Sequence, residues 1–252
     1  SQIIKLYKDV GTTKVNIIDT INSVYLSIIR ELEVFQDKFE IICDLITYVD
    51  VIYSKVFIAE KYNYCKPEIV SASNTKESKE SKESKESKES DKSFVKVTEL
   101  RDCLIEKLQQ SELYVANDIT LGAMDMDGML LYGTNAVGKT SFIRALGISV
   151  IMAQSGLYVP ATSYQFWPYK CIFTRILGND NLFKGLSTFA VEMSELRTIL
   201  RLANKNSLVL GDELCSGTES ISAVSIFVAG IKALYKQQCS FIFATHLHEI
   251  IN

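Results

Sequence analysis

Hydrophobic positions divide the chain into two regions with different spacing. From about Lys14 to Tyr64, apolar residues recur every three or four positions, which is the spacing of one face of an α-helix. This face includes Ile17, Ile21, Val24, Ile28, Leu32, Phe35 and Phe39. We therefore predict long helices in this region, packed as a helical hairpin or as an arm of a helix bundle.

After Phe94 the apolar positions form short runs that turn residues separate. Three of these runs predict buried strands, at 128–132, 207–210 and 240–244. Helical spacing predicts helices at 139–155, 188–204 and 220–235. Short apolar strands that alternate with helices are typical of a parallel sheet covered on both faces. The second region is therefore predicted to have an α/β fold with a mostly parallel sheet flanked by helices.

A low-complexity segment separates the two regions. The triplet Lys-Glu-Ser is repeated five times from Lys76 to Ser90. Almost none of this segment is apolar, so burial cannot compensate the entropy that ordering would cost. We predict a flexible insertion. The predicted parts are a helical segment at 1–66, the insertion at 67–93 and the α/β domain at 94–252.

The composition indicates the kind of compartment in which the protein works but does not identify a binding partner. The net charge is −3, so no overall basic excess indicates nucleic-acid binding. No apolar run reaches the roughly 18 residues of a membrane span, and no secretory signal is present, so we expect a soluble protein with no membrane partner. The six cysteines are scattered, which is typical of free thiols in a reducing, intracellular compartment. The first residue is Ser1, so we expect a fragment of a longer polypeptide.

A phosphate-binding loop is predicted between the first strand of the α/β region and the helix that follows. Gly133-Thr-Asn-Ala-Val-Gly-Lys-Thr140 fits the pattern G-x-x-x-x-G-K-[ST]. Glycines let backbone amides approach phosphate oxygens, and the following helix directs its N-terminal N–H groups at the same anion. Lys139 is expected to bind the β- and γ-phosphates, and the Thr140 hydroxyl to bind Mg²⁺. The predicted ATP/ADP-binding residues are Gly133, Thr134, Asn135, Ala136, Val137, Gly138, Lys139, Thr140 and Ser141.

Acidic residues follow the next buried strand. Leu208-Val-Leu-Gly-Asp212-Glu213 is an apolar run that ends in two carboxylates. Ligands of open α/β sheets bind at the carboxyl ends of the strands, so Asp212 is expected to hold Mg²⁺ there. Glu213 is expected to orient or deprotonate the attacking water. His246 follows another apolar strand and either senses the γ-phosphate or has a structural role. Together these residues predict an ATPase.

Five blocks in this order closely resemble the MutS family of DNA mismatch-repair ATPases. They are Gly133–Ala161, Phe173–Ile176, Gly185–Met193, Asp212–Thr218 and Ala244–Glu249. A weaker resemblance covers Thr98–Glu106, where Asp102-Cys103 replaces His-Pro, and Glu112–Asn117. The resemblance implies an ABC-type P-loop NTPase domain, preceded by long helices of the family's lever and core region.

The resemblance also implies a mechanism. MutS ATPases act as homodimers or heterodimers with composite sites, so Ser187 would reach the nucleotide of the other subunit; otherwise it is an ordinary helix N-cap. Asn135 would contact phosphate or the attacking water. Tyr114 would stack on adenine, or is merely a half-buried strand residue. His246 would couple the nucleotide state to movement on mismatched or branched DNA, which domains mostly outside this chain would bind.

Departures from the family pattern keep other readings open. Val137 stands where most members have glycine, Thr134 replaces proline and Ser216 replaces arginine, which suggests a divergent organelle or large-virus branch. One alternative is an ABC-like or recombination-type ATPase outside repair, although Gly185–Phe189 does not read like LSGGQ. Another is a nucleotide-bound scaffold that does not hydrolyse ATP, although the residues needed for hydrolysis are present.

Overall fold

The computed structural model describes residues 2–70, 92–108, 114–124, 126–134, 137–175, 188–212 and 220–246. The chain divides into two compact units, Ser1–Ser54 and Lys55–Asn252. The predicted three-part division of the chain, with limits near 66 and 93, stays a prediction.

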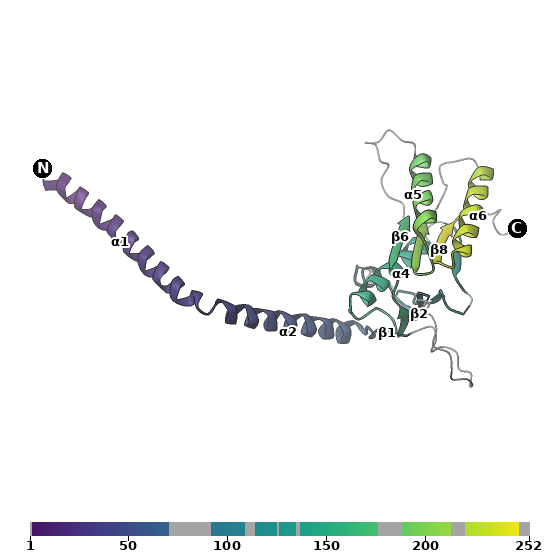
Figure 1. Cartoon of the computed structure of the whole chain (residues 1–252), viewed down its shortest axis with the longest axis horizontal. Helices are drawn as coiled ribbons and strands as arrows, with labels where there is room; N and C mark the ends of the chain where they lie inside the picture. Colours follow the sequence, from purple (N-terminus) through teal and green to yellow (C-terminus); the bar gives the residue numbers. More distant parts are fainter. Residues whose placement is uncertain are drawn as a thin grey trace, which may run out of the picture. The chain divides into compact units, whose positions relative to one another are not determined.

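The N-terminal helices are longer than the hydrophobic spacing predicts. α1 spans Gln2–Glu33 and α2 spans Gln36–Tyr62, and a turn at 34–35 that the sequence does not predict separates them (Figure 1). α1 has no buried residue, and α2 has one, Ala59. Within the first unit, α1 and α2 leave their large apolar side chains exposed. None of the described helices is long and apolar enough to cross a membrane.

A four-stranded parallel sheet forms the centre of the second unit. Its strands are β4 (Gly128–Tyr132), β8 (Ser240–Thr245), β7 (Ser207–Asp212) and β6 (Cys171–Arg175), in that order across the sheet. All neighbouring strands are parallel. The α/β fold, the parallel sheet and its three predicted strands are thereby confirmed.

The second sheet of this unit is not predicted by the sequence pattern. It contains β1 (Glu68–Ile69), β5 (Ser163–Trp167), β2 (Phe94–Leu100) and β3 (Asn117–Leu121), in that order. β1 is parallel to β5, whereas β2 is antiparallel to both of its neighbours. The sheet is assembled from distant segments, since Glu68 pairs with Gln165, and hydrophobic periodicity carries no information about such pairings.

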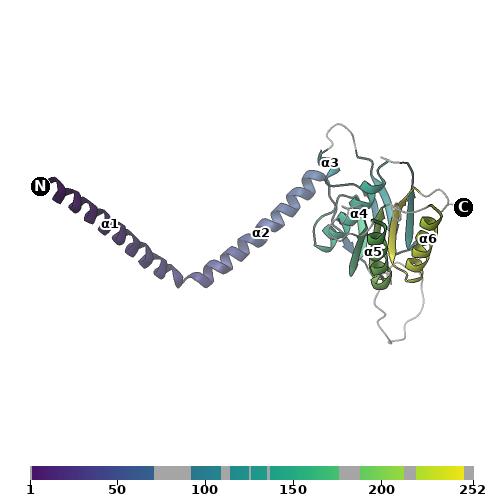
Figure 2. The same cartoon turned by 90° about the horizontal axis from the view of Figure 1, so that it is seen from above.

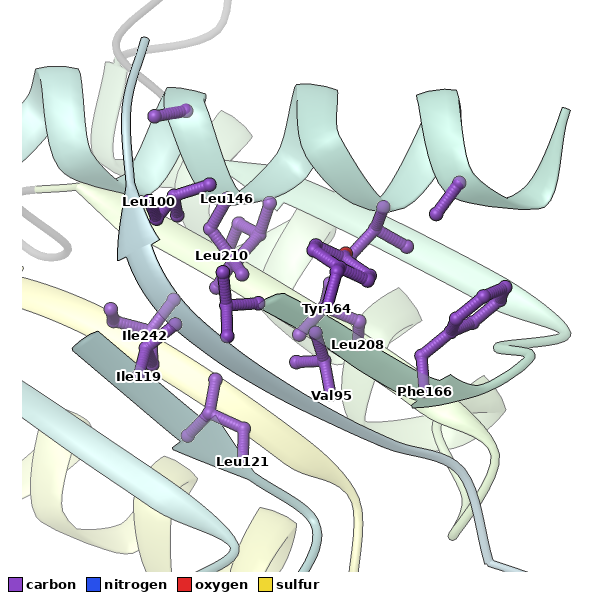
Figure 3. Close-up of a cluster of buried hydrophobic side chains, with 14 of the residues drawn as sticks. Val95, Leu100, Ile119, Leu121, Leu146, Tyr164, Phe166, Leu208, Leu210 and Ile242 are labelled. Carbon is purple, nitrogen blue, oxygen red and sulfur yellow. The ribbon is translucent and has the colours of Figure 1, made fainter. Parts of the chain in front are cut away.

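Helix α4 (Lys139–Gln154) joins the two sheets through one hydrophobic core. Its Leu146 lies with Leu100 of β2 and Leu210 of β7 in a single buried cluster (Figure 3). All three side chains are completely buried. Because α4 begins directly at the end of the predicted phosphate loop, this core fixes the start of α4 relative to both sheets.

A second core lies on the other face of the parallel sheet. Along β8, Ile242 and Ala244 belong to the α4 core, whereas Phe241 and Phe243 belong to the second core. This alternation is the period of two expected for a strand buried on both faces. Two helices, α5 (Thr188–Leu202) and α6 (Ser220–Lys236), cover the second face and lie side by side (Figures 1 and 2). The predicted covering of the sheet by helices is thus confirmed.

Tyr64, just after α2, has a buried hydroxyl group with no hydrogen-bond partner in the part of the chain that the structure describes. Burial, followed by the nearby Cys103 and Glu106, raises the pKa of this phenol from 10 to about 12. We expect Tyr64→Phe to leave the free energy of unfolding at pH 7 unchanged, or to raise it by about 1 kcal/mol, because an unpaired buried polar group is removed. Urea unfolding at pH 7 measures this.

The same variant has an expected pH dependence. The folded protein holds the Tyr64 proton more tightly than the unfolded chain, so this group's contribution to stability falls as pH rises from 10 to about 12. Tyr64→Phe should therefore lose less stability than the wild type between pH 10 and 12. Tyr235→Phe, at an exposed tyrosine, is the control and should follow the wild type. A marked loss of stability in Tyr64→Phe at pH 7 would contradict the expectation.

Candidate nucleotide-binding site

Described residues of the loop between β4 and α4 contact the ammonium group of Lys139. Gly138 precedes the first residue of α4 and has a φ of 93°, a left-handed conformation that favours glycine. The Lys139 Nζ atom donates hydrogen bonds to the carbonyl oxygens of Gly133 and Thr134, both at 2.7 Å. Thr134, Val137 and Gly138 are exposed.

Thr140 and Asp212 meet at the carboxyl end of the parallel sheet. The Thr140 hydroxyl donates a hydrogen bond of 2.5 Å to Oδ2 of Asp212. Asp212 is only 4% exposed, and its Oδ1 atom is buried with no hydrogen-bond partner among the described residues. Mg²⁺ prefers oxygen ligands, and a hydroxyl beside a carboxylate with one unpaired buried oxygen fits that preference. The two predicted metal ligands are therefore adjacent, and their donor atoms suit the ion.

Strand register places His246 at the same edge. Thr245 of β8 is paired with Tyr132 of β4, so His246 and Gly133 each follow one member of this pair. On the other side of β8, Asp212 is paired with Ala244. His246 is half-buried there. The parallel sheet thus brings Gly133 of the predicted phosphate loop, Asp212 and His246 to one edge, where ligands of open α/β sheets bind.

Tyr114 precedes β3 of the second sheet and is half-buried. Its pKa is raised, first by burial and then by the negative charge of Asp102. Asp102 is itself buried, and its Oδ1 accepts hydrogen bonds from the amides of Leu104 and Ile105 at the start of α3 (Ile105–Leu108). Asp102, which replaces a histidine of the family pattern, therefore caps this short helix. The adenine-stacking role of Tyr114 stays a prediction.

Four other predicted site residues lie outside the described part of the chain. They are Asn135, Ala136, Ser187 and Glu213. Their expected contacts with phosphate, with the attacking water and with a second subunit stay predictions. Ser141 is half-buried in the first turn of α4.

Two ion pairs at the end of β6 are not predicted by the motifs. Arg175 at the end of β6 contacts Glu192 and Glu195 of α5. One signal is visible in the sequence, since Glu192 shares the buried face of α5 with Leu196 and Ile199 at helical spacing. A carboxylate on an apolar helix face needs a partner, but the sequence does not identify Arg175 as that partner.

Comparison with known proteins agrees with these features. Residues 129–252 match the family model described as MutS domain V. The chain is 39% identical over 216 residues to a mitochondrial DNA mismatch repair protein mutS homolog of Sarcophyton glaucum, covering 86% of this chain and 20% of that protein. It is 34% identical over 241 residues to a mutS homolog of Acanthamoeba polyphaga mimivirus, covering 82% and 20%.

A bacterial relative shows a similar match. The DNA mismatch repair protein MutS of Petrotoga mobilis is 34% identical over 238 residues, which cover 94% of this chain and 26% of that protein. The chain thus spans between a fifth and about a quarter of the length of these relatives. The match to MutS domain V and the relatives that extend it over the preceding residues show that the chain belongs to the MutS family.

Proposed function

We propose that this chain is the ATP-binding and ATP-hydrolysing part of a MutS-type DNA mismatch-repair protein, with an ABC-type P-loop ATPase domain. The observation that carries the proposal is the pairing of Thr140 with Asp212, beside a loop that already holds Lys139. A positive charge, a hydroxyl and a carboxylate at the carboxyl edge of a parallel sheet are the groups that bind a nucleoside triphosphate and its Mg²⁺ ion.

In this proposal, Lys139 can bind either the carbonyl oxygens of the loop or the phosphate oxygens of ATP. Its ammonium group donates to two carbonyl oxygens of the loop. Phosphate oxygens carry full negative charge and make stronger hydrogen bonds to an ammonium than neutral carbonyls do. ATP would therefore draw Lys139 from Gly133 and Thr134 to the β- and γ-phosphates, while backbone amides of the loop and of α4 bind the remaining oxygens.

Thr140 and Asp212 would hold Mg²⁺, which neutralises phosphate charge when bound. Glu213, the next residue after Asp212, would orient the attacking water or accept its proton. Asn135 would contact the phosphate or that water. His246 at the end of β8 would contact the γ-phosphate and so report whether ATP or ADP is present.

A complete site would require two subunits. Ser187 precedes α5, so its hydroxyl and the N-terminal amides of α5 would approach the γ-phosphate bound by the partner subunit. The partner would be a second copy or a related MutS-type subunit. Tyr114 would stack on the adenine. The remaining parts of the polypeptide would bind mismatched or branched DNA, and the ATP state would move the clamp on that DNA.

The reducing, intracellular setting also stays a proposal. The described cysteines, Cys43, Cys65, Cys103, Cys171 and Cys239, are free thiols in the structure. This state agrees with a reducing compartment.

Steady-state ATP hydrolysis by the full-length protein, with and without duplex DNA, tests the proposed function. We expect mismatched duplex to change the rate several-fold more than a perfectly paired duplex of the same length does, because DNA binding and the ATP state are coupled and coupling energies are roughly 1–3 kcal/mol. Lys139→Ala measured in parallel gives the background rate, since it removes the charge that binds phosphate.

The outcomes separate the alternatives. Hydrolysis that is indifferent to every DNA would favour an ABC-like or recombination-type ATPase outside repair. No hydrolysis above the Lys139→Ala background, with ATP still bound, would favour a scaffold that uses nucleotide without turnover.

A further inference from the structure

The side-chain amide of Gln154 ties the C-terminal end of α4 to the backbone of Tyr169. Its Nε2 atom donates a hydrogen bond of 3.0 Å to the carbonyl oxygen of Tyr169, and its Oε1 atom accepts one of 2.8 Å from the Tyr169 amide. Gln154 is the last residue of α4, and Tyr169 lies between β5 and β6. One side chain thus pairs with both backbone polar groups of a residue in a connecting segment.

Tyr169 is in turn fixed to the amino end of the parallel sheet. It is 4% exposed, and its hydroxyl donates a hydrogen bond of 2.9 Å to Oγ of Ser240. Ser240 is the first residue of β8 and is paired with Leu208 of β7. Asp212, which the Thr140 hydroxyl contacts, is the last residue of β7. Hydrogen bonds therefore tie both ends of α4 to the same sheet, its first turn at the carboxyl edge and its last residue at the amino edge.

Apolar packing fixes α4 against the sheet more firmly than along its own axis. The core holds α4 on the sheet (Figure 3), but apolar attraction is non-directional. Where α4 meets β7 it has Gly147, and a Cβ atom there would lie 2.7 Å from Cδ1 of Leu210. At this close approach the helix has no side chain that locks it lengthwise. Hydrogen bonds are directional, so the two bonds of Gln154 oppose movement of α4 along its axis.

We infer that Gln154 is a positioning residue for the nucleotide-binding site, because it sets the axial position of α4 and thereby holds Thr140 beside Asp212. This inference rests on the proposed function, in which Thr140 and Asp212 hold Mg²⁺. α4 has 16 residues, so its two ends are about 24 Å apart and Gln154 touches neither nucleotide nor metal. A continuous α-helix keeps its rise per residue, so axial movement of its last residue also moves its first turn.

The test compares the full-length wild type with Gln154→Leu, which keeps a side chain of similar size and removes both hydrogen bonds. The affinity for a slowly hydrolysed ATP analogue without Mg²⁺ should match the wild type, because Lys139 is unchanged. Two Mg²⁺ concentrations should rise about tenfold, the lower end of the range seen when the support of a metal ligand is lost. They are the concentration for half-maximal hydrolysis and the concentration for half of the Mg²⁺-dependent gain in analogue affinity.

These concentrations distinguish positioning from a loss of structure. A general loss of stability lowers the amount of active protein but leaves unchanged the Mg²⁺ concentration that the remaining protein requires. Unchanged Mg²⁺ concentrations in Gln154→Leu would therefore overturn the inference, even if the hydrolysis rate fell.

A double variant tests whether Gln154 acts through Thr140. Thr140→Val removes the hydroxyl, so adding Gln154→Leu to Thr140→Val should raise the required Mg²⁺ concentration no further. Residues this far apart usually act independently, and independent effects would multiply. A multiplied effect in the double variant would overturn the positioning role.

Tyr164→Phe is the matched control. The Tyr164 hydroxyl lies 3.3 Å from Oγ of Ser149, so this variant removes a hydrogen bond between α4 and β5 of the second sheet. Both ends of α4 stay tied to the parallel sheet, and the required Mg²⁺ concentration should equal that of the wild type. A rise as large as that in Gln154→Leu would show that any weakened contact of α4 has this effect, and would overturn the specific role of Gln154.

Thr140→Val alone separates this inference from the proposed function. If Thr140→Val raises the required Mg²⁺ concentration and Gln154→Leu does not, the role of Gln154 is wrong and the proposed function stands. If neither Thr140→Val nor Lys139→Ala changes the binding of the analogue with Mg²⁺, the proposed function is wrong, and the inference with it.

Discussion

Replacing Asp212 by asparagine is expected to lower the rate of ATP hydrolysis by roughly 100-fold or more, the size of effect seen when one preorganised electrostatic group is lost from an active site. The variant keeps the shape of the side chain and an oxygen that can accept the 2.5 Å hydrogen bond from Thr140. It loses the negative charge, and with its one oxygen facing Thr140 it places an amide NH2 donor at the unpaired buried Oδ1 position. Initial rates over a range of Mg²⁺ concentrations measure the effect.

The Mg²⁺ dependence distinguishes a metal ligand from a structural residue. Asp212→Asn should need a higher Mg²⁺ concentration for half-maximal hydrolysis, and its nucleotide affinity should depend less on Mg²⁺ than that of the wild type. Thr140→Ser keeps the hydroxyl and should stay close to wild type, whereas Thr140→Val should resemble Asp212→Asn. An unchanged Mg²⁺ requirement in Asp212→Asn would mean that this carboxylate does not hold the ion.

A neighbouring carboxylate provides the contrasting variant. Glu213→Gln should retain Mg²⁺-dependent ATP binding and lose turnover, because its expected role is in activating water rather than in holding the metal. Loss of ATP binding in Glu213→Gln, measured with a slowly hydrolysed analogue, would contradict this division of roles between Asp212 and Glu213.

The parts of the site that the sequence predicts are those that depend on local spacing. The phosphate loop must follow a strand and begin a helix, and β4 and α4 start and end within one residue of their predicted limits. Asp212 had to end a buried strand, and β7 is buried along its whole length. Parallel strands place such carboxyl ends at one edge, so the meeting of Thr140 with Asp212 follows from periodicity and one motif.

The parts that the sequence does not predict depend on pairings between distant residues. The second sheet pairs Lys96 with Thr120 and with Gln165, and nothing in the local pattern specifies such partners. The sequence also does not predict that Arg175 pairs with Glu192, because any arginine could form an ion pair with a carboxylate on a buried helix face. In the sequence, Gly211 is only a small residue before two acidic residues. The need for glycine at this position comes from its partner on the neighbouring strand β8.

Gly211 makes room for the ring of Phe243. The two residues are direct partners across β7 and β8, and the same strand pairs Phe241 with Gly128 of β4. A Cβ atom on Gly211 would lie 2.1 Å from both Cδ1 and Cε1 of Phe243. The ring is 2% exposed and packs edge-to-face on Phe227, with centroids 5.6 Å apart, so it has no space to withdraw. Each phenylalanine of β8 is therefore accommodated by a glycine opposite it.

Gly211→Ala is consequently expected to destabilise the protein by about 1–3 kcal/mol, towards the upper end, since overpacking a dense core forces side chains and backbone to shift. Urea unfolding measures the change. Gly230→Ala in α6 is the matched control: its Cβ would lie 3.6 Å from Leu196, an ordinary contact, and a glycine-to-alanine change within a helix is expected to stabilise by up to about 1 kcal/mol. Phe243→Leu should cost less in the Gly211→Ala background than in the wild type, because the clash has gone. Equal costs in both backgrounds would show that Gly211 is required for another reason.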